Sequence, residues 1–196
     1  MKTLVIYAHP PTKGFCSYIL NRVKKELSER KESFEVIDLY EINYQPVLKE
    51  EELYTAGNDK VSEENKKFQK KIKQAEKLIF IYPVWWASMP AVLKGFLDRV
   101  LTPGFAYNFE KQGLISAFPN KLLDDKEALV FQTLGGPRWA YFLTGNPPKR
   151  VIKLFTLWFA GISTKVIQIF NANKLTEKRK ESLENIVQVN LKRFTN

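Results

Sequence analysis

Hydrophobic residues gather in five short runs along the chain, separated by longer mixed segments. The runs are rich in β-branched and aromatic residues and show little of the alternation of apolar and polar positions that marks a strand with one wet face. Such runs are typical of strands buried on both faces of a sheet. They predict strands at residues 3–8, 34–39, 78–82, 128–133 and 165–170.

The segments between these runs place apolar residues at helical spacing. In residues 90–100 the apolar side chains fall at positions 92, 93, 96, 97 and 100, so we expect Lys94, Asp98 and Arg99 to point away from the core. Ser62, followed by two glutamates, is typical of a helix start. The pattern predicts helices at residues 15–30, 62–75, 90–100, 150–160 and 177–194.

This alternation of strands and helices predicts a doubly wound α/β fold, a five-stranded parallel sheet with helices on both faces and right-handed crossovers. The classical dinucleotide-binding arrangement requires a G-x-G-x-x-G motif after the first strand, and residues 9–17 contain one glycine, Gly14. We therefore predict the flavodoxin-like strand order 2-1-3-4-5. No repeat or break in composition divides the chain, so we expect a single domain over residues 1–196.

In this order, the loops after the first, third and fourth strands meet at one edge of the sheet and form a candidate site. The first loop, residues 9–17, precedes a helix. Its backbone amides, the Ser17 hydroxyl and the Lys13 charge are suited to a phosphate. Capping of the helix by Thr12 or Ser17 alone uses the same geometry, so both interpretations stay open.

Two adjacent tryptophans, Trp85 and Trp86, stand in the second loop, residues 83–89. Pro83 has no N–H to give to a ladder, so we expect the third strand to stop there. Two neighbouring indoles cannot both point into the same core, so at least one is expected to line a surface cleft. An exposed indole offers a surface on which a planar heteroaromatic ring stacks.

The third loop, residues 133–145, contains Gly135 and Gly136. Glycines let the backbone approach a flat ligand closely, or they serve only a tight turn. Arg138 and Tyr141 follow, and are candidates to supply a charge or a proton near a reduced ring. Together the loops offer a phosphate clamp, an aromatic shelf and a glycine turn, which fits a flavin mononucleotide or dinucleotide.

The composition narrows the function further. The net charge is +10, but the lysines are spread among glutamates on helix faces, which is typical of a solvated surface. No zinc-ligand spacing or nucleic-acid motif accompanies the charge, so we expect no metal and no nucleic-acid partner. The single cysteine, Cys16, excludes an internal disulfide and suits the reducing cytoplasm, where we expect the protein. The single histidine, His9, leaves no Ser-His-Asp or Cys-His arrangement, so a hydrolase is poorly supported.

Residues 83–100 carry the most specific pattern, Pro-Val-Trp-Trp followed by Met-Pro-Ala-Val-Leu-Lys-Gly-Phe-Leu-Asp-Arg-Val. It resembles, almost position for position, the flavin-ring loop and following helix of the flavodoxin-like NAD(P)H:quinone oxidoreductases. This DT-diaphorase-like family includes the bacterial modulator of drug activity and the potassium-efflux ancillary flavoproteins. Residues 104–107 resemble the aromatic segment beside the family's quinone pocket, and residues 133–136 resemble its loop over the polar edge of the ring.

The resemblance implies a homodimer with FMN or FAD at the interface. NADH or NADPH would transfer a hydride to flavin N5, and a quinone-like acceptor would then take two electrons in the same pocket. Phe105 and Tyr107 would wall the substrate pocket, and Tyr141 would stabilise charge on the reduced flavin. The residues implied to bind the cofactor are His9, Phe15, Cys16, Ser17, Pro83, Val84, Trp85, Trp86, Ala87, Thr133, Leu134, Gly135 and Gly136.

The chain departs from the family pattern in three places. Gly14, Phe15 and Cys16 stand where Ser or Thr, Phe and Asn are usual. The histidine that partners the tyrosine in the mammalian enzymes is absent from residues 144–148, and Arg138 is a hypothetical substitute as the catalytic positive group. The mammalian C-terminal extension is also absent, which favours FMN over FAD.

Two other functions compete with the enzyme. A regulatory flavoprotein subunit would dock its basic surface on a membrane transporter, and so would make peripheral contact with a membrane protein. The third hypothesis is a one-electron carrier of the flavodoxin type. Such carriers tend to be acidic because they bind basic partners, so a net charge of +10 argues against this hypothesis.

Overall fold

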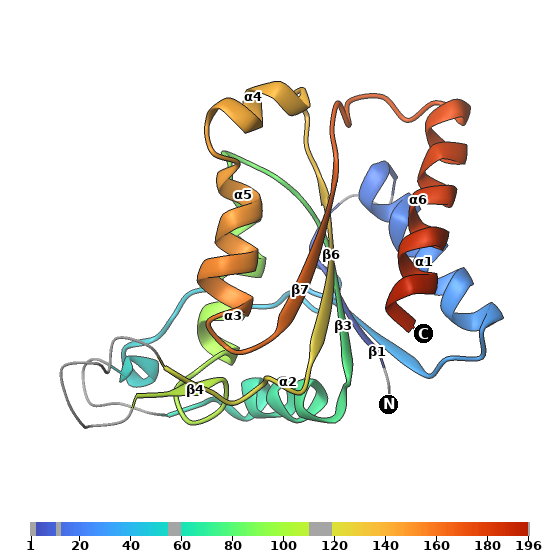
Figure 1. Cartoon of the computed structure of the whole chain (residues 1–196). Coiled ribbons are helices and arrows are strands. Elements are labelled where there is room, and N and C mark those ends of the chain that lie inside the picture. Colours follow the sequence, from blue (N-terminus) through green and yellow to red (C-terminus); the bar gives the residue numbers. More distant parts are fainter. Residues whose placement is uncertain (1–2, 11–12, 55–59, 110–118, 196) are drawn as a thin grey trace.

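A single five-stranded parallel sheet forms the centre of the molecule (Figure 1). The computed structural model describes residues 3–10, 13–54, 60–109 and 119–195. The strand order is β2-β1-β3-β6-β7, which is the predicted order 2-1-3-4-5 when these strands are counted along the chain. The strands are β1 (Thr3–Tyr7), β2 (Phe34–Asp38), β3 (Lys77–Pro83), β6 (Glu127–Thr133) and β7 (Ser163–Ile169).

Helices cover both faces of the sheet, as predicted (Figure 1). On one face lie α1 (Phe15–Glu29) and α6 (Glu177–Thr195). On the other lie α2 (Glu63–Gln74), α3 (Ala91–Val100) and α5 (Pro147–Arg150), which continues into the π-helical segment η3 (Val151–Leu157). The start of α2 is as predicted, because Ser62 is its N-cap and the Ser62 hydroxyl accepts a hydrogen bond from the Asn65 amide at 3.2 Å.

The two faces explain why the strand sequences are apolar without alternation. In β3, Leu78, Phe80 and Tyr82 pack into the core under α2 and α3. Ile79 and Ile81 pack into the core under α1 and α6. Because every residue of such a strand meets a helix layer, both sets of positions must be apolar.

Three short elements fall in segments that the sequence predicts as loops. The antiparallel strands β4 (Tyr107–Asn108) and β5 (Asn120–Lys121) pair with each other, and α4 (Arg138–Leu143) stands between β6 and α5. None of the residues of α4 is buried, so it has no inward apolar stripe for a periodicity argument to detect. A short 3₁₀ turn, η1 (Glu50–Glu52), follows β2.

The expectation that Arg99 points away from the core is wrong. Its guanidinium is buried and makes two hydrogen bonds to Glu52, Nε to Oε2 at 2.8 Å and Nη2 to Oε1 at 2.9 Å. It also donates to the backbone carbonyl of Gln45. The segment after β2 therefore folds back over α3. Gly95 permits the contact, since a Cβ there would lie 2.1 Å from the Pro46 carbonyl oxygen.

Candidate functional site

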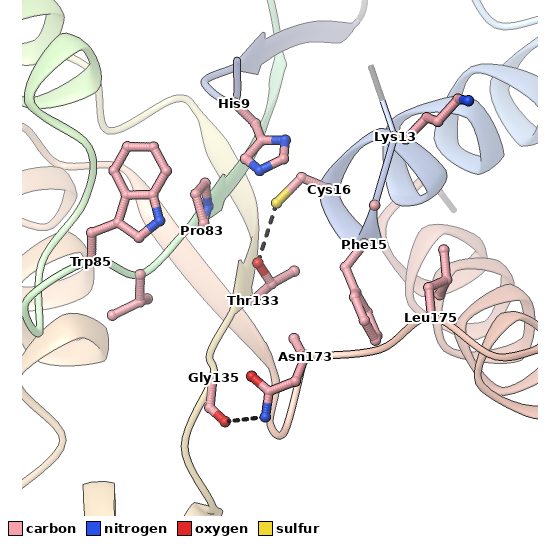
Figure 2. Close-up of a pocket in the computed structure, with 13 residues that line it drawn as sticks. His9, Lys13, Phe15, Cys16, Pro83, Trp85, Thr133, Gly135, Asn173 and Leu175 are labelled. Atoms are coloured by element: carbon pink, nitrogen blue, oxygen red, sulfur yellow. Dashed lines mark hydrogen bonds between the residues drawn. The ribbon is translucent and has the colours of Figure 1, made fainter. Parts of the chain in front are cut away.

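A pocket of about 400 Å³ opens at the carboxyl ends of β1, β3 and β6, where the three predicted loops meet (Figure 2). Trp85 lies on one side of it, Phe15 and Leu175 lie on the other, and Thr133 lies between them. The predicted cofactor-binding residues that line it are His9, Phe15, Cys16, Pro83, Val84, Trp85, Thr133 and Gly135. The sheet topology thus brings together residues that are more than a hundred positions apart.

The first loop presents the N-terminus of α1 to the pocket. Gly14, at φ 126°, is the N-cap and supplies no side-chain hydrogen bond. The Ser17 hydroxyl donates back to the Gly14 carbonyl at 3.0 Å, so Ser17 lies outside the pocket lining and does not cap the first amides. Thr12 lies outside the described residues. The positive end of the helix dipole and Lys13 border the same pocket, although the Lys13 side chain points away from it in this structure (Figure 2).

Cys16 joins the first loop to the third. Its Sγ lies 3.2 Å from the Thr133 Oγ1, in a contact that is almost fully buried (Figure 2). Burial raises the pKa of the Cys16 thiol to about 12, although the bond to Thr133 acts in the opposite direction. The thiol is therefore neutral at physiological pH, and it serves here as a weak hydrogen-bonding partner of Thr133.

His9 stands at the rim between the first two loops. Its Nδ1 lies 3.5 Å from the Tyr7 hydroxyl, and its ring centroid is 6.5 Å from that of Trp85. Burial raises the pKa of Tyr7, so this phenol stays protonated and neutral. His9 thus has one aromatic neighbour on β1 and another in the loop after β3.

The second loop is a tight turn built without glycine. Trp85 and Ser88 exchange two backbone hydrogen bonds at 2.9 and 3.0 Å. Trp86 and Ala87, the two central residues, have φ of 49° and 58°, which is strained for residues with a Cβ. The turn leaves Trp85 beside the pocket and Trp86 fully exposed, with neither indole in the core. The expectation that at least one tryptophan lines a cleft is confirmed, and Trp86 and Ala87 are not among the lining residues.

The third loop is held by a segment that the sequence did not mark as part of the site. Residues 170–175, after β7, run beside residues 133–136: the Ala172 amide donates to the Leu134 carbonyl at 2.9 Å, and Asn173 Nδ2 donates to the Gly135 carbonyl at 3.1 Å (Figure 2). Ala172, Asn173 and Leu175 complete the lining, while the Leu134 side chain is buried away from it. The position of this segment after a strand of the same parallel sheet was the available signal.

Tyr141 stands against the glycine turn. A Cβ on Gly136 would lie 3.3 Å from the Tyr141 ring, so this glycine makes room for the phenol. The ring also contacts Phe170 at a centroid distance of 5.8 Å. Arg138 begins α4 and is exposed. Gly136, Tyr141 and Arg138 border the loop and are not among the lining residues of the pocket.

Phe105 and Tyr107 lie elsewhere in the same chain. Tyr107 packs edge-on against Phe159 at 4.9 Å and against Phe109 at 5.6 Å. Phe105 packs against the core under α3. Within one chain, the fold does not bring these two aromatics to the pocket.

In the part of the chain that the structure describes, no three His, Cys, Asp or Glu side chains are grouped to hold a metal ion. No helix there is both long and apolar enough to cross a membrane.

Comparison with known proteins places the chain among oxidoreductases. A model of the flavodoxin-like fold family matches residues 1–193. The chain is similar to a Haemophilus influenzae protein named as an NAD(P)H oxidoreductase, with 38% identity over 136 residues, or 69% of this chain and 65% of that protein. It is 32% identical over 203 residues to the Homo sapiens ribosyldihydronicotinamide dehydrogenase [quinone], over 91% of this chain and 86% of that one. The structure resembles the NAD(P)H:quinone oxidoreductase of Methanothermobacter marburgensis, with a TM-score of 0.83, 25% identity and coverage of 100% and 98%.

Proposed function

Because the chain belongs to the flavodoxin-like fold family, we propose that it is a flavin-dependent NAD(P)H oxidoreductase that reduces quinones or related acceptors. The observation that carries the proposal is the pocket, in which a helix N-terminus, an exposed indole and a glycine turn face one cavity. The names of the relatives in Haemophilus influenzae and Homo sapiens support the same reaction class. NADH or NADPH is the donor in this proposal.

The residues present fit a flavin mononucleotide. Gly14 to Cys16 at the start of α1, with Lys13, would hold the phosphate, because a helix N-terminus and a cation both favour an anion. Trp85 would support the ring, and the backbone of residues 133–136 would bond its polar edge. A bound flavin supplies hydride acceptance from NAD(P)H and electron delivery to the quinone, with donor and acceptor using the pocket in turn.

The protein's own contribution is to shape and polarise this pocket. The neutral pair of Cys16 and Thr133 holds two loops together without placing a charge beneath the ligand. Tyr141 would donate its phenolic proton toward the reduced ring, and Arg138 at the start of α4 would add positive charge on the same side. Replacement of Arg138 by Ala is expected to slow the reductive half-reaction, and an unchanged rate would remove Arg138 from the mechanism.

We also infer that the protein is a homodimer. Large apolar side chains project into solvent from α4, from η3 and from the residue after η3, namely Trp139, Phe142, Leu143, Leu154, Phe155 and Trp158. An exposed apolar surface of this kind marks an interface. We infer that a second copy of the chain covers this surface. Phe105 and Tyr107, which do not reach the pocket of their own chain, would then border the pocket of the other copy.

The test begins with the visible spectrum of the purified protein and its titration with FMN and, separately, FAD. Yellow protein that NADH or NADPH bleaches under argon, and that a quinone then reoxidises, is the expected result. Trp85→Ala is expected to weaken FMN binding about tenfold by removing a stacking surface, while Trp86→Ala, the matched control at a fully exposed indole, changes it less than twofold. A protein that takes up neither flavin would refute the proposal.

A further inference from the structure

Three polar side chains form a row near the carboxyl ends of β3, β6 and β7, on the face covered by α3 and α5. Tyr82 of β3 pairs in register with Gln132 of β6, and Gln132 pairs in register with Gln168 of β7. Side chains at the same register in parallel strands point to the same face. Tyr82 and Gln132 are fully buried, so their polar atoms need partners inside the protein.

The row continues past the sheet to Asn146. Gln132 Nε2 donates to the Tyr82 hydroxyl at 2.8 Å and to the Pro148 carbonyl at 2.9 Å. Gln168 Nε2 donates to Gln132 Oε1 at 2.9 Å and to Asn146 Oδ1 at 2.9 Å, and Asn146 Nδ2 returns a bond to Gln168 Oε1 at 2.7 Å. We name Tyr82, Gln132, Gln168 and Asn146 the amide ladder. Each glutamine amide donates two hydrogen bonds, and of these four bonds three lie within the ladder and one goes to the Pro148 carbonyl.

Asn146 connects the ladder to the helix that carries Tyr141. Its φ of 52° is left-handed, a conformation that asparagine tolerates better than most residues. Its backbone amide donates to the Tyr141 carbonyl at 2.7 Å, and its carbonyl accepts from the Arg150 amide at 3.2 Å. Asn146 therefore bonds back to α4 from beyond its C-cap, Thr144, and is itself the N-cap of α5. Its position is fixed by a side-chain pair to β7.

We propose that Gln168 and Asn146 are positioning residues for Tyr141, and that the amide ladder sets where the Tyr141 ring stands against Gly136 beside the pocket. The inference rests on the proposed flavin chemistry for its functional consequence. Within one chain no residue of α4 is buried, so the contacts of the Tyr141 ring with Gly136 and Phe170 are weak constraints on where this helix lies. The amide ladder fixes the position of α4 more closely, because hydrogen bonds between amides set direction as well as distance.

The experiment compares two ladder variants with two matched controls. Gln168→Leu removes the amide at similar volume, and Asn146→Gly removes the side chain while it keeps the left-handed backbone accessible. Gln69→Leu is the first control, because Gln69 Nε2 makes two hydrogen bonds, to the Val100 carbonyl and to Thr102, away from the site. Asn43→Gly is the second control, at another left-handed asparagine with φ 51°.

The first readout is amide hydrogen exchange of the ligand-free protein, which needs no flavin. Both ladder variants are expected to speed exchange about tenfold or more in residues 138–148, with β3 and β6 unchanged, whereas the controls leave residues 138–148 as in the wild type. The second readout is the FMN-loaded protein. The dissociation constant for FMN should change less than about threefold, while bleaching at saturating NADH or NADPH slows about tenfold, because the phosphate clamp is intact and Tyr141 is displaced.

Each outcome decides the inference. Unchanged exchange in residues 138–148 of both ladder variants overturns it, as does an equal loss of FMN binding and bleaching, which is the signature of general disruption. If Gln168→Leu does not fold, Asn146→Gly decides alone. If the wild type takes up no flavin, the proposed function fails, and the exchange readout still shows whether the ladder holds α4.

Discussion

The two faces of the sheet are built from different interactions. Under α1 and α6 the sheet contributes apolar side chains, such as Val5, Leu129 and Phe131, to a continuous hydrophobic core. The opposite face also has an apolar core, but it adds the amide ladder near the pocket and the Arg99–Glu52 pair beside α3. Apolar burial stabilises without direction, whereas hydrogen bonds fix the placement of particular segments. Both faces therefore stabilise the frame by apolar burial, and the face under α3 and α5 also sets the geometry of its loops.

The largest effect is expected from Phe131→Ala on the apolar face. Phe131 is fully buried, so truncation leaves a cavity and should lower the free energy of unfolding by about 3–5 kcal/mol. Urea unfolding measures this free energy. The control is Val189→Ala, at an exposed residue, which should leave the free energy of unfolding within about 0.5 kcal/mol of the wild type. FMN binding by the folded fraction should stay within about twofold of the wild type. If Phe131→Ala instead lost FMN binding without losing stability, the proposed difference between the two faces would be wrong.

A smaller effect, about 2–3 kcal/mol, is expected from Glu52→Gln, which leaves the buried Arg99 without its counter-charge. Burial acts to raise the pKa of Glu52, but the hydrogen bonds from Arg99 and from the Lys49 backbone lower it overall. Because the folded pKa is depressed, the stabilisation is present above the ordinary carboxyl pKa of about 4.3 and is lost as pH falls through the folded value.

The wild type should therefore lose stability between about pH 5 and pH 3 more steeply than Glu52→Gln, as measured by urea midpoints at each pH. Glu63→Gln is the control, since the Glu63 pair with Lys66 is exposed on the surface of α2. Parallel pH profiles for the wild type and Glu52→Gln would show that the ion pair does not hold the segment over α3.

The smallest of the three effects concerns the outer surfaces. The outer face of α1 carries charged residues such as Lys24, Lys25 and Glu29, whereas α4 and η3 expose large apolar side chains. Phe155→Glu is expected to weaken dimerisation about tenfold, since it places a charge in the apolar surface. Sedimentation over a concentration series measures this change, and Val47→Glu, at another exposed apolar residue, should have no effect. Wild-type protein that sediments as a monomer would contradict the dimer.

The strands and their order followed from the sequence because burial on two faces leaves a readable apolar pattern, as in residues 78–82. That strand order in turn predicted that the loops after the first, third and fourth strands meet at one edge of the sheet. Arg99 could not be placed, because its partner Glu52 lies 47 positions away and helical spacing alone assigns it to solvent. Asn173 was missed for a similar reason: it joins the site through a bond to Gly135, 38 positions away, rather than through any local motif.

The composition of the amide ladder has a consequence for an enzyme that handles protons. Three of its members, Gln132, Gln168 and Asn146, have no titratable group, and burial raises the pKa of the fourth, Tyr82, so that it stays neutral. In the proposed reaction, redox chemistry on a flavin ring would take up and release protons close to Tyr141. The ladder, which we propose to position this tyrosine, would change neither its charge nor its hydrogen-bond directions when those protons move. If the proposed function holds, a change of local pH would therefore alter the protonation of the pocket without changing the hydrogen bonds that hold α4.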